Sequence, residues 1–179
     1  DGLGRDMLTR LLFGARNTVG IAFITTLLAF VIGGIMGLLS AIYTGWFDQV
    51  ASRVVDVLMA IPQLIFALML LTIFGTSIPI LIIVIATLDA TRIFRVTRAV
   101  SLNVVVLDYF EAARLRGERI FWLCIREILP NITAPLLAEF GLRFCFVFLM
   151  IAALSFLGLG IQPPTADWGS MVRENAVLI

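Results

Sequence analysis

One acidic and three basic side chains interrupt an otherwise apolar part of the chain, and they are the first candidates for chemistry. Asp89 is followed by Arg92, Arg95 and Arg98 at steps of three residues. Residues three apart share a helix face, and ionisable groups at membrane depth are costly and normally face protein or water. We therefore consider Asp89 and Arg92 as a pair within a helix bundle or beside a transport path. The alternative is that the helix leaves the membrane early and its arginines reach the headgroups.

The residues that usually carry enzyme chemistry are missing or isolated. The chain has no His, which removes the usual general base and the commonest metal ligand. Its two cysteines, Cys124 and Cys145, form no CxxC pair. Ser155 is a lone hydroxyl, more typical of a helix hydrogen bond than of a nucleophile. An intramembrane enzyme is therefore disfavoured, and we expect no catalytic residue, metal site or bound cofactor in this chain.

The composition is that of an integral membrane protein. Of 179 residues, 61% are apolar and 14% are charged, and the mean hydropathy is +1.08. A soluble domain averages about half apolar and about a quarter charged residues. The net charge of +1 gives no reason to expect a nucleic-acid partner. Because the sequence opens without Met and ends abruptly, we expect a piece of a longer protein.

Four apolar segments are long enough for membrane spans, which need about 20 residues each. The first contains Gly33 and Gly37, a GxxxG spacing that allows close helix packing. The uncharged window 57–88 is too long for one span, and the GTSIP sequence at 75–79 predicts a turn within it. Pro62 predicts a kink or a helix start. The expected all-α bundle has spans at 18–43, 57–74, 79–97 and 135–161.

The arginines indicate which side of the membrane the connections lie on. With four spans, the 44–56 loop and an insert at about 99–134 share one side. That side receives nine arginines (53, 92, 95, 98, 114, 116, 119, 126 and 143), and the other side receives four (5, 10, 16 and 173). The positive-inside rule makes the first side cytoplasmic. We therefore predict a single membrane domain over 1–179 with one cytoplasmic insert.

The insert is predicted to form two short helices around a glycine. Good helix formers run from 107 to 116, with Asp108 as the expected N-cap and Glu111 three residues later, a capping-box arrangement. Gly117 then breaks the helix. A second helix is expected over 118–128, until a proline stops it and returns the chain to the membrane. Such an element can dock into a groove of another protein, or lie as an amphipathic helix on lipid.

The sequence EAARLRGERIFWLCIREILP, residues 111–130, resembles the EAA loop of bacterial ABC importer permeases. Glu127 departs from that pattern, which usually has an apolar residue there. The stretches GRDMLTRLLFGARNTVG and SFLGLGIQPPTADWGSMV resemble segments near the second and fifth spans of dipeptide and oligopeptide permeases. The residues that match the loop are Glu111, Ala112, Ala113, Gly117, Leu129 and Pro130.

The resemblance implies a permease subunit of the dipeptide, oligopeptide or nickel type in a bacterial inner membrane. Its four spans would be the second to fifth of six. It implies a second, often non-identical permease subunit, two ATPase subunits that bind ATP and Mg²⁺, and an external substrate-binding protein. The six matching residues would form a coupling helix in a cleft of the ATPase. Asp89 and Arg92 match no family motif and are candidates for the substrate path.

One other class of transporter fits the apolar composition. An ion-coupled secondary transporter or channel could use Asp89 and its arginines. Such proteins need no element that docks an ATPase, so the charged insert favours the importer. The resemblance points to peptides as the solute, although relatives carry nickel, opines and other small molecules.

Overall fold

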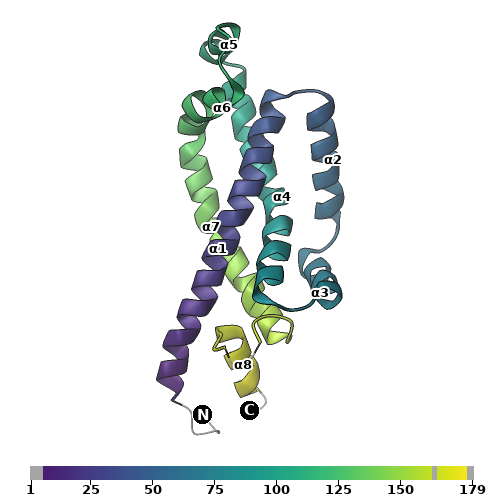
Figure 1. The fold of residues 1–179 in the computed structure, drawn as a ribbon, viewed down its shortest axis with the longest axis vertical. Coiled ribbons are helices and arrows are strands. Elements are labelled where there is room, and N and C mark those ends of the chain that lie inside the picture. The colour runs from purple at the N-terminus through teal and green to yellow at the C-terminus, as the bar shows by residue number, and fades with distance from the viewer. Residues whose placement is uncertain (1–5, 163–164, 177–179) are drawn as a thin grey trace. The chain divides into compact units, whose positions relative to one another are not determined.

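The computed structural model describes residues 6–162 and 165–176, and nearly all of them are helical (Figure 1). No strand occurs in these two ranges, so the predicted all-α class is confirmed for them. The short element η1 is a π-helix. In chain order the elements are α1 (Met7–Ile42), α2 (Trp46–Ala60), α3 (Gln63–Phe74), α4 (Ile78–Val105), α5 (Asp108–Leu115), α6 (Ile120–Trp122), η1 (Leu123–Ile128), α7 (Leu129–Phe156) and α8 (Trp168–Ala176).

The residues group into two compact units. Unit 1 takes the described residues of Asp1–Leu28, Ile61–Thr87 and Arg143–Ile179. Unit 2 takes Ala29–Ala60 and Leu88–Leu142. Helices α1, α4 and α7 contribute residues to both units. The single membrane domain over 1–179 stays a prediction.

Among the described residues, two helices are long and apolar enough to cross a membrane. They are α1 and the continuous helix Ile120–Phe156, which α6, η1 and α7 form together. Helices α2 and α3 make a third candidate only as a bent pair. The break lies at Ile61 and Pro62, because proline lacks the N–H that would continue the helix. The predicted kink or helix start at Pro62 is confirmed, since α2 ends at Ala60 and α3 begins at Gln63.

The other predicted span boundaries need correction. The turn at GTSIP is confirmed, since α3 ends at Phe74 and α4 begins at Ile78, but α4 then runs on to Val105 rather than ending near 97. Helix α7 begins before 135 and ends at Phe156 rather than near 161. The helix continues past 97 because residues 98–105 contain no Pro or Gly that would break it.

Within unit 2, α1 and α4 touch backbone to backbone. A Cβ added at Gly33 would collide with the carbonyl oxygen of Ala90 and lie 3.0 Å from the nitrogen of Phe94. A Cβ added at Gly37 would lie 2.9 Å from the carbonyl oxygen of Phe94 and 2.8 Å from the Cβ of Thr97. The predicted close packing at this GxxxG spacing is therefore confirmed, and α4 is the helix that it packs against.

Within unit 1, the residues around the start of α8 fasten it to α1. Asp167 is fully buried, accepts a hydrogen bond from the Thr18 hydroxyl (2.8 Å) and caps α8 by accepting from the N–H of Ser170 (3.0 Å). The indole N–H of Trp168 donates to the carbonyl of Leu11 (3.0 Å). These contacts join segments about 150 residues apart in the chain.

Candidate functional site

The first turn of α5 is built differently from the sequence expectation. Leu107, in extended backbone, is the N-cap residue, and no side chain caps the helix. The predicted capping box with Asp108 as the N-cap is therefore wrong. Asp108 and Glu111 instead lie inside the first turn, where negative charges interact favourably with the helix dipole.

The end of α5 is fixed by Gly117, as predicted. Gly117 has a φ of +81°. Its N–H donates to the carbonyl of Arg114 (3.0 Å), and the N–H of Glu118 donates to the carbonyl of Ala113 (3.4 Å). These two bonds make a Schellman motif, which requires a left-handed residue at this position. A Cβ at Gly117 would meet nothing within 4 Å, so glycine is needed for its backbone angle rather than for space.

One face of α5 rests on a small apolar core, which we call the loop core. Phe110 and Ala113, three residues apart and both buried, supply the contribution of α5. Asn131 of α7 adds a polar contact by donating to the hydroxyl of Tyr109 (3.1 Å). The helix is thus held as a fixed element rather than as a mobile loop. The loop core consists of Ile42, Val104, Phe110, Ala113, Leu123, Ile128 and Ile132.

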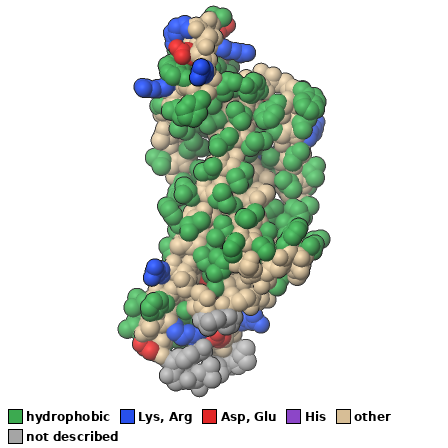
Figure 2. Space-filling model, in the orientation of Figure 1, with side chains coloured by type: hydrophobic (Ala, Val, Ile, Leu, Met, Phe, Trp, Pro, Cys, Tyr) green, Lys and Arg blue, Asp and Glu red, His purple; other side chains and the backbone are tan. Residues whose placement is uncertain are grey.

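The opposite face of α5 is open to a partner. Figure 2 shows charged side chains gathered over this helix at the top of the view. Apolar side chains lie beside them, with Leu115 82% exposed and Phe121 and Val106 each 76% exposed. Of the six residues predicted for coupling, one, Ala113, is buried, and five are exposed: Glu111, Ala112, Gly117, Leu129 and Pro130. Ala113 therefore seats the helix in its own chain.

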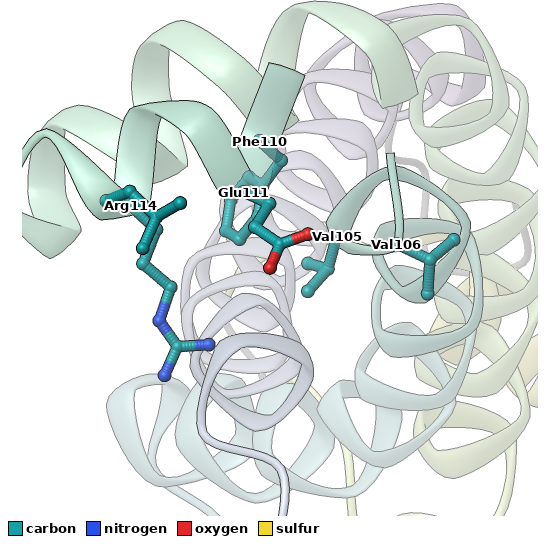
Figure 3. A pocket seen from close by; sticks show the side chains of 6 residues that line it. Val105, Val106, Phe110, Glu111 and Arg114 are labelled. Carbon is teal, nitrogen blue, oxygen red and sulfur yellow. The ribbon is translucent and has the colours of Figure 1, made fainter. Parts of the chain in front are cut away.

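A hollow lies between α5 and the end of α4 (Figure 3). The carboxylate of Glu111 points into it toward Val105. The sequence did not mark Val106 and Leu115 as functional, because an apolar pattern alone does not tell buried positions from exposed ones. The residues that line the hollow are Val105, Val106, Phe110, Glu111, Arg114 and Leu115.

The chain is helical without a break from Ile120 into α7, which corrects the expectation that Pro130 ends a helix. Residues 123–128 form a π-helix, and the N–H of Leu129 donates to the carbonyl of Cys124. Pro130 follows as the second residue of α7. Proline cannot donate to the fourth residue before it and clashes with that carbonyl. Because a π-helix pairs residues five apart, it carries the chain past the proline without a stop.

The candidate path residues lie on α4. Asp89 is 1% exposed, and Arg92 is half-buried. The next two arginines have partners on α2: Arg95 pairs with Asp56 at 2.6 Å, and Arg98 pairs with Asp48. The sequence reasoning missed these acidic partners. The spacing of eight residues between Asp48 and Asp56, which repeats a helix face, was the available signal.

Asp48 accepts hydrogen bonds from three side chains of unit 2. Arg98 donates to both of its carboxylate oxygens, and the hydroxyls of Ser40 and Ser52 also donate to it. Asp48 lies in the first turn of α2, so these contacts join α2 to α1 and to α4.

The described residues contain no group of three or more His, Cys, Asp or Glu side chains placed to hold a metal ion. What these residues offer chemically is a fixed surface helix, α5, and a network of ion pairs on α4. Such an arrangement can bind a partner and transmit movement.

Comparison with known proteins matches the chain to one family and to several named permease proteins. The family described as "Binding-protein-dependent transport system inner membrane component" matches residues 29–179. The chain is 34% identical over 174 residues to the glutathione transport system permease protein GsiD of Pectobacterium atrosepticum, covering 97% of this chain and 58% of that protein.

Two further relatives carry peptide-transport names. A putative peptide transport system permease protein of Brucella suis is 38% identical over 175 residues, covering 98% of this chain and 59% of that protein. The dipeptide transport system permease protein DppC of Haemophilus influenzae is 34% identical over 174 residues, covering 97% of this chain and 59% of that protein. The chain thus spans just under three fifths of the length of these relatives.

Proposed function

The chain belongs to the family of inner-membrane components of binding-protein-dependent transport systems, and on that premise we propose that it is a permease subunit of an ATP-driven peptide importer. The names of its relatives, which refer to peptide, dipeptide and glutathione transport, support this solute class. The observation that carries the proposal is α5, a helix held by its own core with an open outer face. It occupies the segment that matches the EAA loop.

The proposed assembly needs other proteins. A second permease subunit would complete the membrane part, two ATPase subunits would bind ATP and Mg²⁺, and an external binding protein would deliver the peptide. In this proposal the chain itself binds no cofactor and carries no catalytic residue. Its contribution is to convert movement at α5 into movement of the spans.

The coupling step follows from how α5 is seated. Its exposed apolar side chain, Leu115, and the hollow beside Glu111 would receive side chains of the ATPase. Ala113 lies in the loop core, so a displaced α5 would pull on the ends of α1, α4 and α7 that share this core. The Schellman motif at Gly117 would keep α5 at a constant length while it moves.

Four spans in a bacterial inner membrane, with α5 on the cytoplasmic side, remain our proposed topology. The chain would use α1, the bent pair α2–α3, α4, and the continuous helix Ile120–Phe156. The charged side chains of α4 oppose its insertion into a membrane. The ion pairs of Arg95 and Arg98 with Asp56 and Asp48 lower the cost of insertion, because paired charges are tolerated in a membrane far better than isolated ones.

Asp89 and Arg92 remain our candidates for the substrate path. Since Asp89 is almost fully buried in its own chain, a peptide could reach its carboxylate only when neighbouring helices separate. That requirement fits a site that opens alternately to the two sides of the membrane.

The proposal is tested by co-purification with the full-length protein. Tagged protein is extracted in mild detergent, and its partners are identified by mass spectrometry. We expect wild type to retain an ATPase subunit. A variant with Glu111→Lys and Leu115→Glu, both at exposed positions, should lose it, because the new charges face the proposed docking surface.

A matched control uses an exposed valine elsewhere. Val172 of α8 is 60% exposed, so Val172→Glu repeats the apolar-to-acidic change of Leu115→Glu outside α5 and should keep the ATPase. Size-exclusion profiles check that all variants remain folded. Retention of the ATPase by the α5 variant, or its absence from wild type, would reject α5 as the docking element. ATP-dependent uptake of a labelled dipeptide by the reconstituted complex tests the solute class.

A further inference from the structure

A cluster of four polar residues joins three helices of unit 2. Asp48, in the first turn of α2, accepts hydrogen bonds from Nε and a terminal nitrogen of Arg98 on α4. The hydroxyl of Ser40 on α1 donates to the same carboxylate, and that of Ser52 on α2 lies 3.4 Å from it. We call these four residues the Asp48 cluster.

A second ion pair between the same helices provides a comparison. Arg95 and Asp56 make a single contact, and their side chains are 54% and 43% exposed. The side chains of Arg98 and Asp48 are only 31% and 13% exposed. A two-pronged arginine–carboxylate pair fixes geometry as well as charge, whereas exposed single pairs contribute little. The Asp48 cluster is therefore the more constraining of these two ionic contacts between α2 and α4.

The same turn of α4 is also in close contact with α1. A Cβ at Gly37 would lie 3.1 Å from the nitrogen of Arg98 and 2.9 Å from the carbonyl oxygen of Phe94. At this level α4 is thus held on one side by backbone contact with α1 and on another by the carboxylate of α2. Sliding of one helix past the others would break both contacts.

The loop core lies six residues further along α4. Val104 packs there with Ile42 of α1 and with Phe110 and Ala113 of α5. Any displacement of α5 therefore acts on the ends of α1 and α4 that the Asp48 cluster ties to α2. Packed side chains and ion pairs that share rigid helices are the physical route by which such a displacement spreads.

We propose that the Asp48 cluster is the joint that makes α2 move together with α1 and α4 when α5 is displaced. Asp48 and Arg98 are then positioning residues for transport. The inference rests on the proposed function, because it takes the ATPase as the agent that displaces α5. A broken joint would let α5 move while α2 stays behind, so that ATP is hydrolysed with little peptide moved.

The test is the ratio of peptide transported to ATP hydrolysed by the complete complex in proteoliposomes. For Asp48→Asn we expect a fall on the order of tenfold, the usual size of a coupling effect, with ATP hydrolysis maintained. Asp56→Asn is the matched control, since it removes the acidic partner of the exposed pair between the same helices. Its ratio should stay within about twofold of wild type.

Each outcome bears on the joint. A wild-type ratio in Asp48→Asn, or an equal loss in Asp56→Asn, would overturn it. If Asp48→Asn fails to assemble, the double variant Ser40→Ala with Ser52→Ala is measured instead, because it leaves the ion pair in place. It should lower the ratio of peptide transported to ATP hydrolysed by about threefold, as expected for lost neutral hydrogen bonds. An unchanged ratio in the double variant would also overturn the joint. A wild-type complex without ATP-driven uptake overturns the proposed function itself, a result that the ratio measurement separates from failure of the joint.

Discussion

At the scale of single residues, the same residue type has different structural roles at different positions. Ala112 faces outward and Ala113 lies in the loop core, although both match the EAA sequence. Gly33 and Gly37 make room for a neighbouring backbone, whereas Gly117 has open space around it and supplies a positive φ. The sequence alone predicts small residues here, and only the geometry separates these roles.

Gly117 offers a test of backbone angle without a steric clash. Gly117→Val should destabilise the end of α5 by about 1–2 kcal/mol, because a residue with a Cβ resists the left-handed region. Gly117→Asn should cost clearly less, since Asn tolerates that region. Hydrogen exchange of the α5 amides in the purified protein measures the difference, with exchange in the valine variant faster by about tenfold or more. Equal exchange in the two variants would show that the Schellman motif does not hold α5.

At the scale of elements, helix existence was easier to predict than helix ends. The turn at GTSIP, the break at Pro62 and the stop at Gly117 all follow from proline and glycine chemistry, which acts locally. The ion pairs of α4 could not be predicted in the same way, because Asp48 and Asp56 lie 50 and 39 residues from their arginine partners. The persistence of the helix through Pro130 depends on a π-helix, for which the sequence carries no local signal.

The contact between α1 and α4 can be tested with adjacent glycines. Gly33→Ala should lower stability by about 1–3 kcal/mol, because the added methyl group overpacks the contact with α4. Gly34→Ala is the control: its Cβ would meet nothing within 4 Å, and alanine favours a helix over glycine by up to about 1 kcal/mol. Thermal unfolding of the purified protein in detergent compares them. A melting temperature that falls equally in both variants would argue against close packing at Gly33.

At the scale of the whole molecule, the comparisons support the family but do not test the site residues. Family membership comes from the match over 29–179 and was expected from the EAA resemblance. The residues proposed to contact the ATPase and those proposed to line the substrate path were predicted from the sequence, and both sets stay predictions. A path formed with a second subunit cannot be read from one chain, because its lining depends on side chains that the partner contributes.

The proposed topology places Ser77, in the link between α3 and α4, outside the cytoplasm. Ser77→Cys, in a background with Cys124→Ser and Cys145→Ser, should react with an impermeant maleimide in right-side-out vesicles. Arg119→Cys, beside α5, should react only after the vesicles are opened, and Val172→Cys should react from outside. All three positions are exposed. Labelling of Ser77→Cys only in opened vesicles would show that α3 and α4 do not cross, and the four-span topology would fail.

The π-helix at 123–128 has a consequence for how this segment varies among homologues. A π-helix accommodates one more residue than an α-helix needs for the same path, so the stretch between Gly117 and Pro130 carries a surplus residue. A homologue that lacks one residue in this stretch would keep α5 and α7 in register with an ordinary α-helix between them. Single-residue gaps in alignments should therefore gather at 123–128 and stay out of α5, where a deletion would rotate Phe110 and Ala113 out of the loop core.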